Sequence, residues 1–265
     1  MTASWSISEL PQMKKFIFAV LLTALLLGAG SAQEKPWTEW TKVEAEKILN
    51  DSAWGHTQTD TDTSEMMYSP TSQSGISSSN RSGVMGTTSD RSSVNSSRAA
   101  QGAKNQAISI NYRVRLLSAK PVRQAFMRVI ELAQKTPDEE LVGGLRSFVD
   151  RDFSEFIVVA VTFDSTDGRY SGPALQAFAS SNAGKLKNNT YLERKDGKRV
   201  FLMQYHPPIN DGLGAKFIFP RVVDEKKFVN PDSGSFRFYS EVTSQIKLNV
   251  TFKTADLMYN GKFEY

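Results

Sequence analysis

The sequence predicts an α+β fold, with a largely antiparallel sheet and two or three helices on one face. Residues 108–265 hold fourteen of the sixteen Phe residues, which is enough apolar mass for one core. Within this region, apolar residues at helical spacing gather early, whereas apolar and polar residues alternate after residue 189. Helices and strands that are segregated along the chain are typical of the α+β class.

The first 32 residues have the three parts of an export signal. Lys14 and Lys15 precede a charge-free apolar run at residues 16–27, and small residues lead to an expected cleavage site after Ala32. A spanning helix needs about 20 apolar residues, so we predict a signal peptide over 1–32 and no transmembrane anchor after cleavage. Met13 is an alternative start, in which case residues 1–12 are not translated. The mature protein is therefore expected to be periplasmic or secreted.

Residues 33–56 are expected to form a short aromatic helical segment. Thr41 and Glu44 have the spacing of a capping box, and Trp37, Trp40 and Trp54 lie around the helix. A helix this short needs tertiary packing, so one interpretation packs the tryptophans on the C-terminal domain. The other makes all three a partner-binding anchor, because Trp is enriched at binding hot spots.

Residues 57–107 are predicted to be a disordered, low-complexity linker. This stretch contains twenty Ser or Thr residues and one aromatic residue, Tyr68, and it shows no helix or strand periodicity. Such a composition cannot bury enough apolar surface to offset the entropy of ordering. We therefore place the boundary of the α+β domain at residue 108.

The first half of the domain, residues 108–265, is expected to combine two strands with helices. Residues 108–116 alternate as a half-buried strand does, and residues 156–163 form a continuous apolar run that is typical of a central strand. Helical spacing covers residues 122–133, and a capping box opens a second helix at residue 136. A third helix is expected near Pro173, with Leu175 and Phe178 facing inward.

The second half is expected to be mainly strands. Asp196 and Gly197 lie between two strand-like segments, and this dipeptide favours a type I′ hairpin. Alternation then predicts strands over residues 215–219 and 246–252. Residues 257–265 are expected to close the sheet.

A resemblance can be stated at the aromatic segment. Trp37-x-x-Trp40, followed by Leu49-Asn50-Asp51-Ser52-x-Trp54, resembles the opening of a group of uncharacterised secreted bacterial proteins. The resemblance implies export and a shared architecture, and it brings no established activity with it.

Composition excludes several kinds of chemistry. The chain has no cysteine, so it has no disulfide, cysteine nucleophile or zinc-thiolate site. Without residues 1–32, two of the 32 basic and one of the 28 acidic residues are lost, which leaves 30 − 27 = +3. Such a mild charge gives no reason to expect nucleic acid as a partner. We expect no cofactor, and no metal site, since one of the two histidines, His56, lies at the edge of the linker.

The candidate catalytic residues are few. His206 lies at a strand end, Asp211 follows it closely, and Asp164 follows the expected central strand. A His–Asp pair can activate a serine nucleophile, but no G-x-S-x-G motif occurs in the domain. The sequence therefore favours a non-catalytic binding module of the cell envelope, whose partner is an envelope protein or a surface polymer. The alternatives are an envelope hydrolase that uses His206 with a nearby carboxylate, and a binder of a small apolar ligand between sheet and helices.

Overall fold

The computed structural model describes residues 35–62, 108–134 and 139–265. The chain divides into two compact units at Glu39 and Trp40, and the described part of the first unit is a 3-10 turn, η1 (Trp37–Glu39). The rest of the fold concerns the second unit. The signal peptide, most of the predicted linker and the start of the second predicted helix lie outside the described residues.

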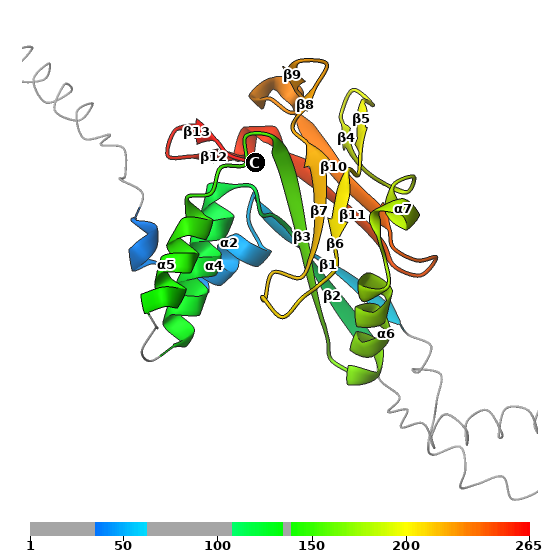
Figure 1. The fold of residues 1–265 in the computed structure, drawn as a ribbon, viewed down its shortest axis with the longest axis horizontal. Helices are drawn as coiled ribbons and strands as arrows, with labels where there is room; N and C mark the ends of the chain where they lie inside the picture. The colour runs from blue at the N-terminus through cyan, green and yellow to red at the C-terminus, as the bar shows by residue number, and fades with distance from the viewer. Residues whose placement is uncertain (1–34, 63–107, 135–138) are drawn as a thin grey trace, which may run out of the picture. The chain divides into compact units, whose positions relative to one another are not determined.

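The second unit combines helices with short and long strands (Figure 1). Its helices are α2 (Lys42–Asn50), α4 (Lys120–Ala133), α5 (Glu139–Val149), α6 (Gly168–Ala179), α7 (Ala183–Leu186), η4 (Pro231–Ser233) and η5 (Thr254–Asp256). Its longer strands are β1 (Gly55–Asp62), β2 (Ile108–Leu116), β3 (Phe156–Ser165), β4 (Thr190–Arg194), β7 (Ala215–Pro220), β10 (Ser235–Glu241) and β11 (Lys247–Lys253). Its short strands are β5 (Arg199–Phe201), β6 (Gln204–His206), β8 (Val222–Val223), β9 (Lys226–Lys227), β12 (Met258–Tyr259) and β13 (Lys262–Phe263).

The strands form two main antiparallel sheets. The first sheet has the order β1-β2-β3-β7-β6, and the second has the order β11-β10-β4-β5. Every strand pair in both sheets is antiparallel. The predicted α+β class is confirmed, and its antiparallel strands are divided between two sheets.

The core lies between the two sheets. Phe217 and Phe219 of β7 both contact Phe238 of β10, with ring centroids 5.3 and 6.1 Å apart. Phe236 and Phe252 stack at 5.3 Å within the second sheet. Burying aromatic rings at such edge-on and offset geometries contributes beyond the area that they remove from water, so this Phe-rich layer is the main apolar core.

Helices α2, α4 and α5 gather on the side of the first sheet that faces away from this core (Figure 1). Thr41 and Glu44 form the predicted capping box at the start of α2. At its end, the buried Arg115 of β2 donates from Nε to the Leu49 carbonyl at 2.9 Å. A Cβ atom at Gly55 would lie 2.2 Å from that same carbonyl, so only glycine lets β1 follow α2 so closely.

Helix α6 packs on the opposite, core-facing side. Phe178 is fully buried there and stacks on Phe163 of β3 at 5.2 Å, as expected for an inward side chain. The prediction for Leu175 was wrong, since 51% of it is exposed. The helix also begins at Gly168, before the predicted start, and continues through Pro173.

Strand β1 corrects the predicted boundary of the linker. Residues 57–62 belong to β1, which pairs with β2 from Gly55 opposite Arg115 to Asp62 opposite Ile108. The strand has no apolar alternation, so its pairing partner rather than its own pattern holds it in the sheet.

The two sheets are also joined along both edges. On one side, the Gln58 side chain of β1 donates to the Lys247 carbonyl at 2.8 Å and accepts from the Asn249 amide at 2.9 Å. On the other side, the chain crosses between sheets where Leu202 bonds to β4 and Met203 bonds to β7. These links cover part of the sheet edges in the described residues, and unpaired edges would invite other chains to pair.

Two predicted turns differ in detail. The hairpin between β4 and β5 is present, but only Gly197 has a positive φ, and Arg194 pairs with Lys198 around a three-residue loop. This is the geometry of a turn with a glycine bulge rather than of a type I′ turn. Residues 257–265 form the separate β12–β13 hairpin and do not close a sheet.

Two of the three tryptophans in residues 33–56, Trp40 and Trp54, belong to the second unit. Trp40 is 7% exposed and lies in the core. The Trp54 indole donates to the Glu264 carbonyl at 2.7 Å. Trp37 lies in η1 of the first unit. The interpretation that packs Trp40 and Trp54 on the domain therefore holds, and Trp40 is not an exposed anchor.

Candidate functional site

A groove of about 610 Å3 lies on the helix side of the first sheet. It runs between strands β3, β7 and β6 on one side and the end of α5 with residues 151–153 on the other. The loop from Pro207 to Leu213 borders it. Pockets for small ligands are typically about 300–1,000 Å3, so this groove is the strongest candidate site that includes sequence-predicted residues.

The floor of the groove follows from strand register. Val158 of β3 lies opposite Ile218 of β7, and Ile218 lies opposite Gln204 of β6. In the neighbouring row, Lys216 lies opposite His206. Because side chains two apart share a face, the inward burial of Phe217 and Phe219 turns Lys216 and Ile218 toward the groove.

The far wall is aromatic and is held by two arginines. Phe148 and Phe153 line it, and Phe156 at the start of β3 adds a third ring to the lining. The guanidinium of Arg123 lies over the Phe153 ring, 4.7 Å from its centroid, and donates to the Val149 carbonyl at 3.1 Å. Burial lowers the pKa of Arg123 to about 10, and its several carbonyl acceptors offset the cost of burying that charge.

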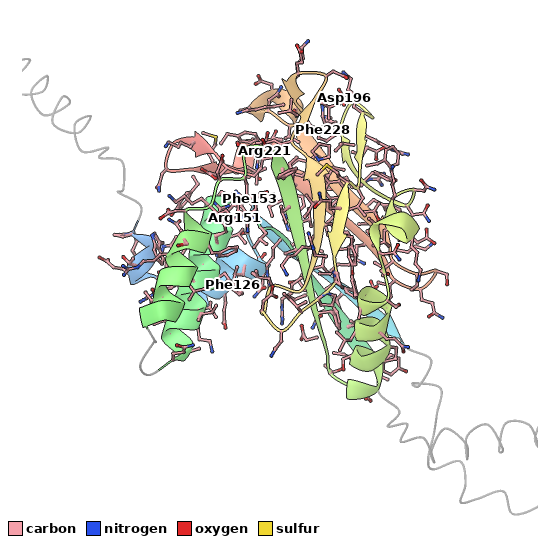
Figure 2. The ribbon with its side chains drawn as sticks, viewed as in Figure 1. Phe126, Arg151, Phe153, Asp196, Arg221 and Phe228 are labelled. Carbon is pink, nitrogen blue, oxygen red and sulfur yellow. The ribbon has the colours of Figure 1, made fainter. Side chains whose placement is uncertain are left out.

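Arg221 holds the same segment from the other end. Its Nε donates to the Phe153 carbonyl at 2.9 Å and to the Phe156 carbonyl at 3.2 Å. Its guanidinium also lies 4.0 Å from the centre of the Tyr265 ring. Figure 2 shows Arg151, Phe153 and Arg221 close together above α5. A wall fixed by buried charged hydrogen bonds is preorganised, which lowers the entropic cost of binding a ligand.

The bordering loop has a shape that requires glycine. Gly212 and Gly214 have φ values of 72° and 76°. A Cβ atom at Gly214 would lie 2.2 Å from the Val161 carbonyl. Inside the loop, Asp211 accepts from the Leu213 amide at 2.9 Å, which closes an Asx-type turn.

The groove brings together His206 and Asp211, but not as a catalytic pair. The second carboxylate oxygen of Asp211 lies 2.6 Å from Lys216 Nζ. In the described part of the chain, neither Asp211 oxygen forms a hydrogen bond with His206. The cross-strand neighbour of His206 is Lys216, so the residue beside the imidazole is a cation rather than an orienting acid.

Asp164 lies elsewhere. It ends β3 on the same face of the sheet, where it pairs with Arg113 at 2.9 Å. Ala160 of β3 lies opposite Lys216 of β7, and Lys216 lies opposite His206 of β6, so these three residues form one row across the sheet. Four residues along a strand span about 13 Å, so Asp164 and His206 cannot act on one substrate atom.

The groove also lacks a nucleophile of the usual kinds. Its described lining contains no Ser, Thr, Cys or Tyr. The second acid of the lining, Asp152, uses both carboxylate oxygens to accept from Ser154, at 2.9 and 2.7 Å. Across residues 35–62, 108–134 and 139–265, no three His, Asp or Glu side chains gather as a metal-binding set.

One cation of the groove has no acid of its own. Within the described ranges, Arg151 forms no ion pair, and its guanidinium lies 5.7 Å from the centre of the Phe153 ring. Lys216 and both acids are bound within the protein, as given above. The groove therefore offers an apolar surface with one available positive charge at its wall.

Sequence reasoning missed most of this site. Phe148 was expected only on the apolar face of the second helix, and Phe153, Ile218 and Arg151 were not singled out. One signal was present in the sequence. In residues 156–163, the odd-numbered and the even-numbered positions are both mainly apolar, which indicates that both faces of β3 are covered. The buried arginines that shape the wall, Arg123 and Arg221, leave no pattern in the sequence.

Comparison of the chain with protein-family models, with curated proteins and with solved structures finds no match. Among the described residues, no helix has both the length and the apolar character needed to cross a membrane.

Proposed function

We propose that the protein is an exported, non-catalytic binding protein of the cell envelope that holds an amphipathic ligand in this groove. The observation that carries the proposal is the composition of the groove: a floor and wall of apolar side chains beside Arg151. An apolar chain would lie on Ile218 and the phenylalanine wall, and an anionic head would pair with the guanidinium. Arginine suits this role because its planar fork binds carboxylate and phosphate groups.

The hydrogen bonds and ion pairs of the other charged groups in the groove support this ligand class. Lys216 and Asp211 cancel each other, and Asp152 is engaged by Ser154. A ligand with a cationic head would meet Arg151, and both oxygens of the Asp152 carboxylate, although charged, already accept from Ser154. Charge complementarity therefore favours an anionic amphiphile such as a medium-chain carboxylate.

The binding test compares decanoate with decanol by titration calorimetry on the full chain. We expect decanoate to bind and Arg151→Gln to weaken it about tenfold, the loss of roughly one charge-assisted hydrogen bond. Decanol should bind the variant and the wild type equally. Ile218→Gln should weaken both ligands, whereas the control Leu175→Gln, at an exposed site on α6, should weaken neither. Failure of decanoate to bind the wild type contradicts the proposal.

The hydrolase alternative has its own test. If His206 were a general base, His206→Ala would abolish turnover of a short-chain nitrophenyl ester. We expect equal rates for the variant and the wild type, because the imidazole has neither an orienting acid nor a nucleophile beside it. A loss of more than about a hundredfold, the usual effect of removing such a base, would restore the enzyme hypothesis.

The location and the partner remain proposals of the same kind. Cleavage after Ala32 predicts that the mature chain begins at Gln33, and N-terminal sequencing of the exported protein checks it. An envelope protein or a surface polymer as the partner stays a prediction. Of the three tryptophans in residues 33–56, Trp37 is the one that lies outside the second unit. Pull-down with Trp37→Ala against the wild type tests that role.

A further inference from the structure

A second pocket of about 550 Å3 lies at the opposite end of the first sheet, on its core-facing side. It is bounded by β1 and β2, by α6 and by the turn between β10 and β11. Its lining residues outside the turn are Asp60, Thr61, Ile108, Ile110, Tyr112, Tyr170, Pro173, Ala174 and Ala177. None of them lines the groove of the proposed function, so the two sites are separate.

Asp60 is a half-buried carboxylate of this pocket. Register places it opposite Ile110, on the face of β1 that looks toward the core. A half-buried carboxylate has lost part of its contact with water, so a positive partner stabilises it. Its Oδ1 accepts from the Gln58 side chain at 3.1 Å, and within the described ranges Oδ2 accepts no hydrogen bond.

The charge of the described lining is one-sided. Asp60 is its charged residue, and no Lys, Arg or His is among the described lining residues. The negative charge of Asp60 also acts on the neighbouring Tyr112. The pKa of Tyr112 is raised to about 12, mainly by burial and secondly by the charge of Asp60. A positive group in the pocket would be stabilised by Asp60 without a competing cation.

The remaining walls suit an apolar body. Ile108, Ile110 and Ile246 supply aliphatic surface, and two tyrosine rings supply aromatic surface. On α6, the small side chains of Ala174 and Ala177 leave the space open. Aromatic rings attract organic ammonium groups through their negative faces, and an adjacent carboxylate adds to that attraction.

We propose that this pocket binds an organic ammonium ion with an apolar body, with Asp60 as the residue that pairs with its charge. The inference is independent of the groove, because it uses different residues and requires a ligand of opposite charge.

The test compares benzylamine, which is cationic at pH 7.5, with neutral benzyl alcohol on the full chain. We expect benzylamine to bind at least about tenfold more tightly than benzyl alcohol, because its ammonium group would pair with Asp60. The isosteric variant Asp60→Asn should reduce the two affinities to parity. Asp256→Asn, at an exposed position in η5, is the matched control and should keep the preference.

A second measurement does not depend on how the variant folds. In the wild type, benzylamine should shift the methyl resonances of Ile108, Ile110 and Ile246, and should leave those of Ile218 and Ile209 in the groove unchanged. Equal binding of the amine and the alcohol, an unchanged preference in Asp60→Asn, or shifts confined to the groove would each overturn the proposal.

Discussion

Single buried polar side chains hold this fold at the points where its segments meet. Arg115 binds the end of α2, and Arg123 and Arg221 hold residues 149–156 from two sides. Each guanidinium has several donors and can satisfy several carbonyls at once. Removal of one such residue leaves buried acceptors without partners, which costs more than the net worth of each bond.

His56 makes stability depend on pH. Its ring lies 5.0 Å from that of Phe252, and burial lowers its pKa, against a smaller opposite effect of Asp51. The unfolded chain therefore takes up this proton more readily than the folded one, so stability is lost as the pH falls below about 6.5. We expect a lower urea midpoint at pH 5.5 than at pH 7.5.

The variant His56→Gln checks the assignment, because it cannot titrate. Its urea midpoint should change less between these two pH values than that of the wild type. An equal change in the variant would place the pH dependence on other groups.

At the scale of elements, the short hairpins differ in how well their residues suit their turns. The β12–β13 turn has Asn260 and Gly261 at φ values of 49° and 72°, as a type I′ turn requires. The β8–β9 turn has Asp224 and Glu225 at 50° and 59°. A glutamate in this left-handed conformation is strained by roughly 1 kcal/mol.

The double change Asp224→Asn with Glu225→Gly should therefore stabilise the protein. We expect a gain of roughly 0.5 kcal/mol in the free energy of unfolding, measured by urea denaturation, because the relief of strain is partly offset by the unfolded-state entropy that glycine adds. The reverse control, Gly261→Ala, should lose about the same amount. A destabilised double variant would show that the β8–β9 turn is held by contacts of the replaced side chains.

At the scale of the whole molecule, one side chain joins the two sheets along one edge. Gln58 takes the place of a strand-to-strand pair between β1 and β11, with a donor and an acceptor to the β11 backbone. Replacing it with an apolar residue of similar size leaves the Lys247 carbonyl and the Asn249 amide without those partners.

Gln58→Met should lower the free energy of unfolding by about 1 kcal/mol, the net worth of two solvent-exposed hydrogen bonds that water can partly replace. Hydrogen exchange at the Asn249 amide should also become faster in the variant. Gln176→Met, on the exposed side of α6, is the control and should change neither quantity. Unchanged protection of Asn249 would mean that the two sheets stay joined without this side chain.

The parts of the site that could be predicted from the sequence are those whose residues lie close together along the chain. His206 and Asp211 lie five residues apart in the sequence, and both line the groove. The ion pair between Asp211 and Lys216 changes what they can do, and it depends on the loop geometry that Gly212 and Gly214 allow. Asp164 was a poor partner for His206 because a register between distant strands, which no local pattern encodes, separates them.

The sequence by itself determined the features that short-range periodicity and capping encode. These include the α+β class, the capping box at Thr41, the alternating strands β2 and β11, and the hairpin at Gly197. Each depends on residues within a few positions of one another, whose preferences act before any tertiary contact forms.

Only the tertiary structure decided where polar segments go. Strand β1 is polar on both faces, so its sequence does not predict a strand. Its place in the fold is set by pairing with β2 and by the hydrogen bonds of Gln58 to β11. The split into two sheets, the aromatic wall at Phe153 and the inward position of Asp60 arise in the same way. Their physical reason is shared: each depends on hydrogen bonds and packing between residues that are far apart in the chain, so the energy that selects them exists only in the assembled fold.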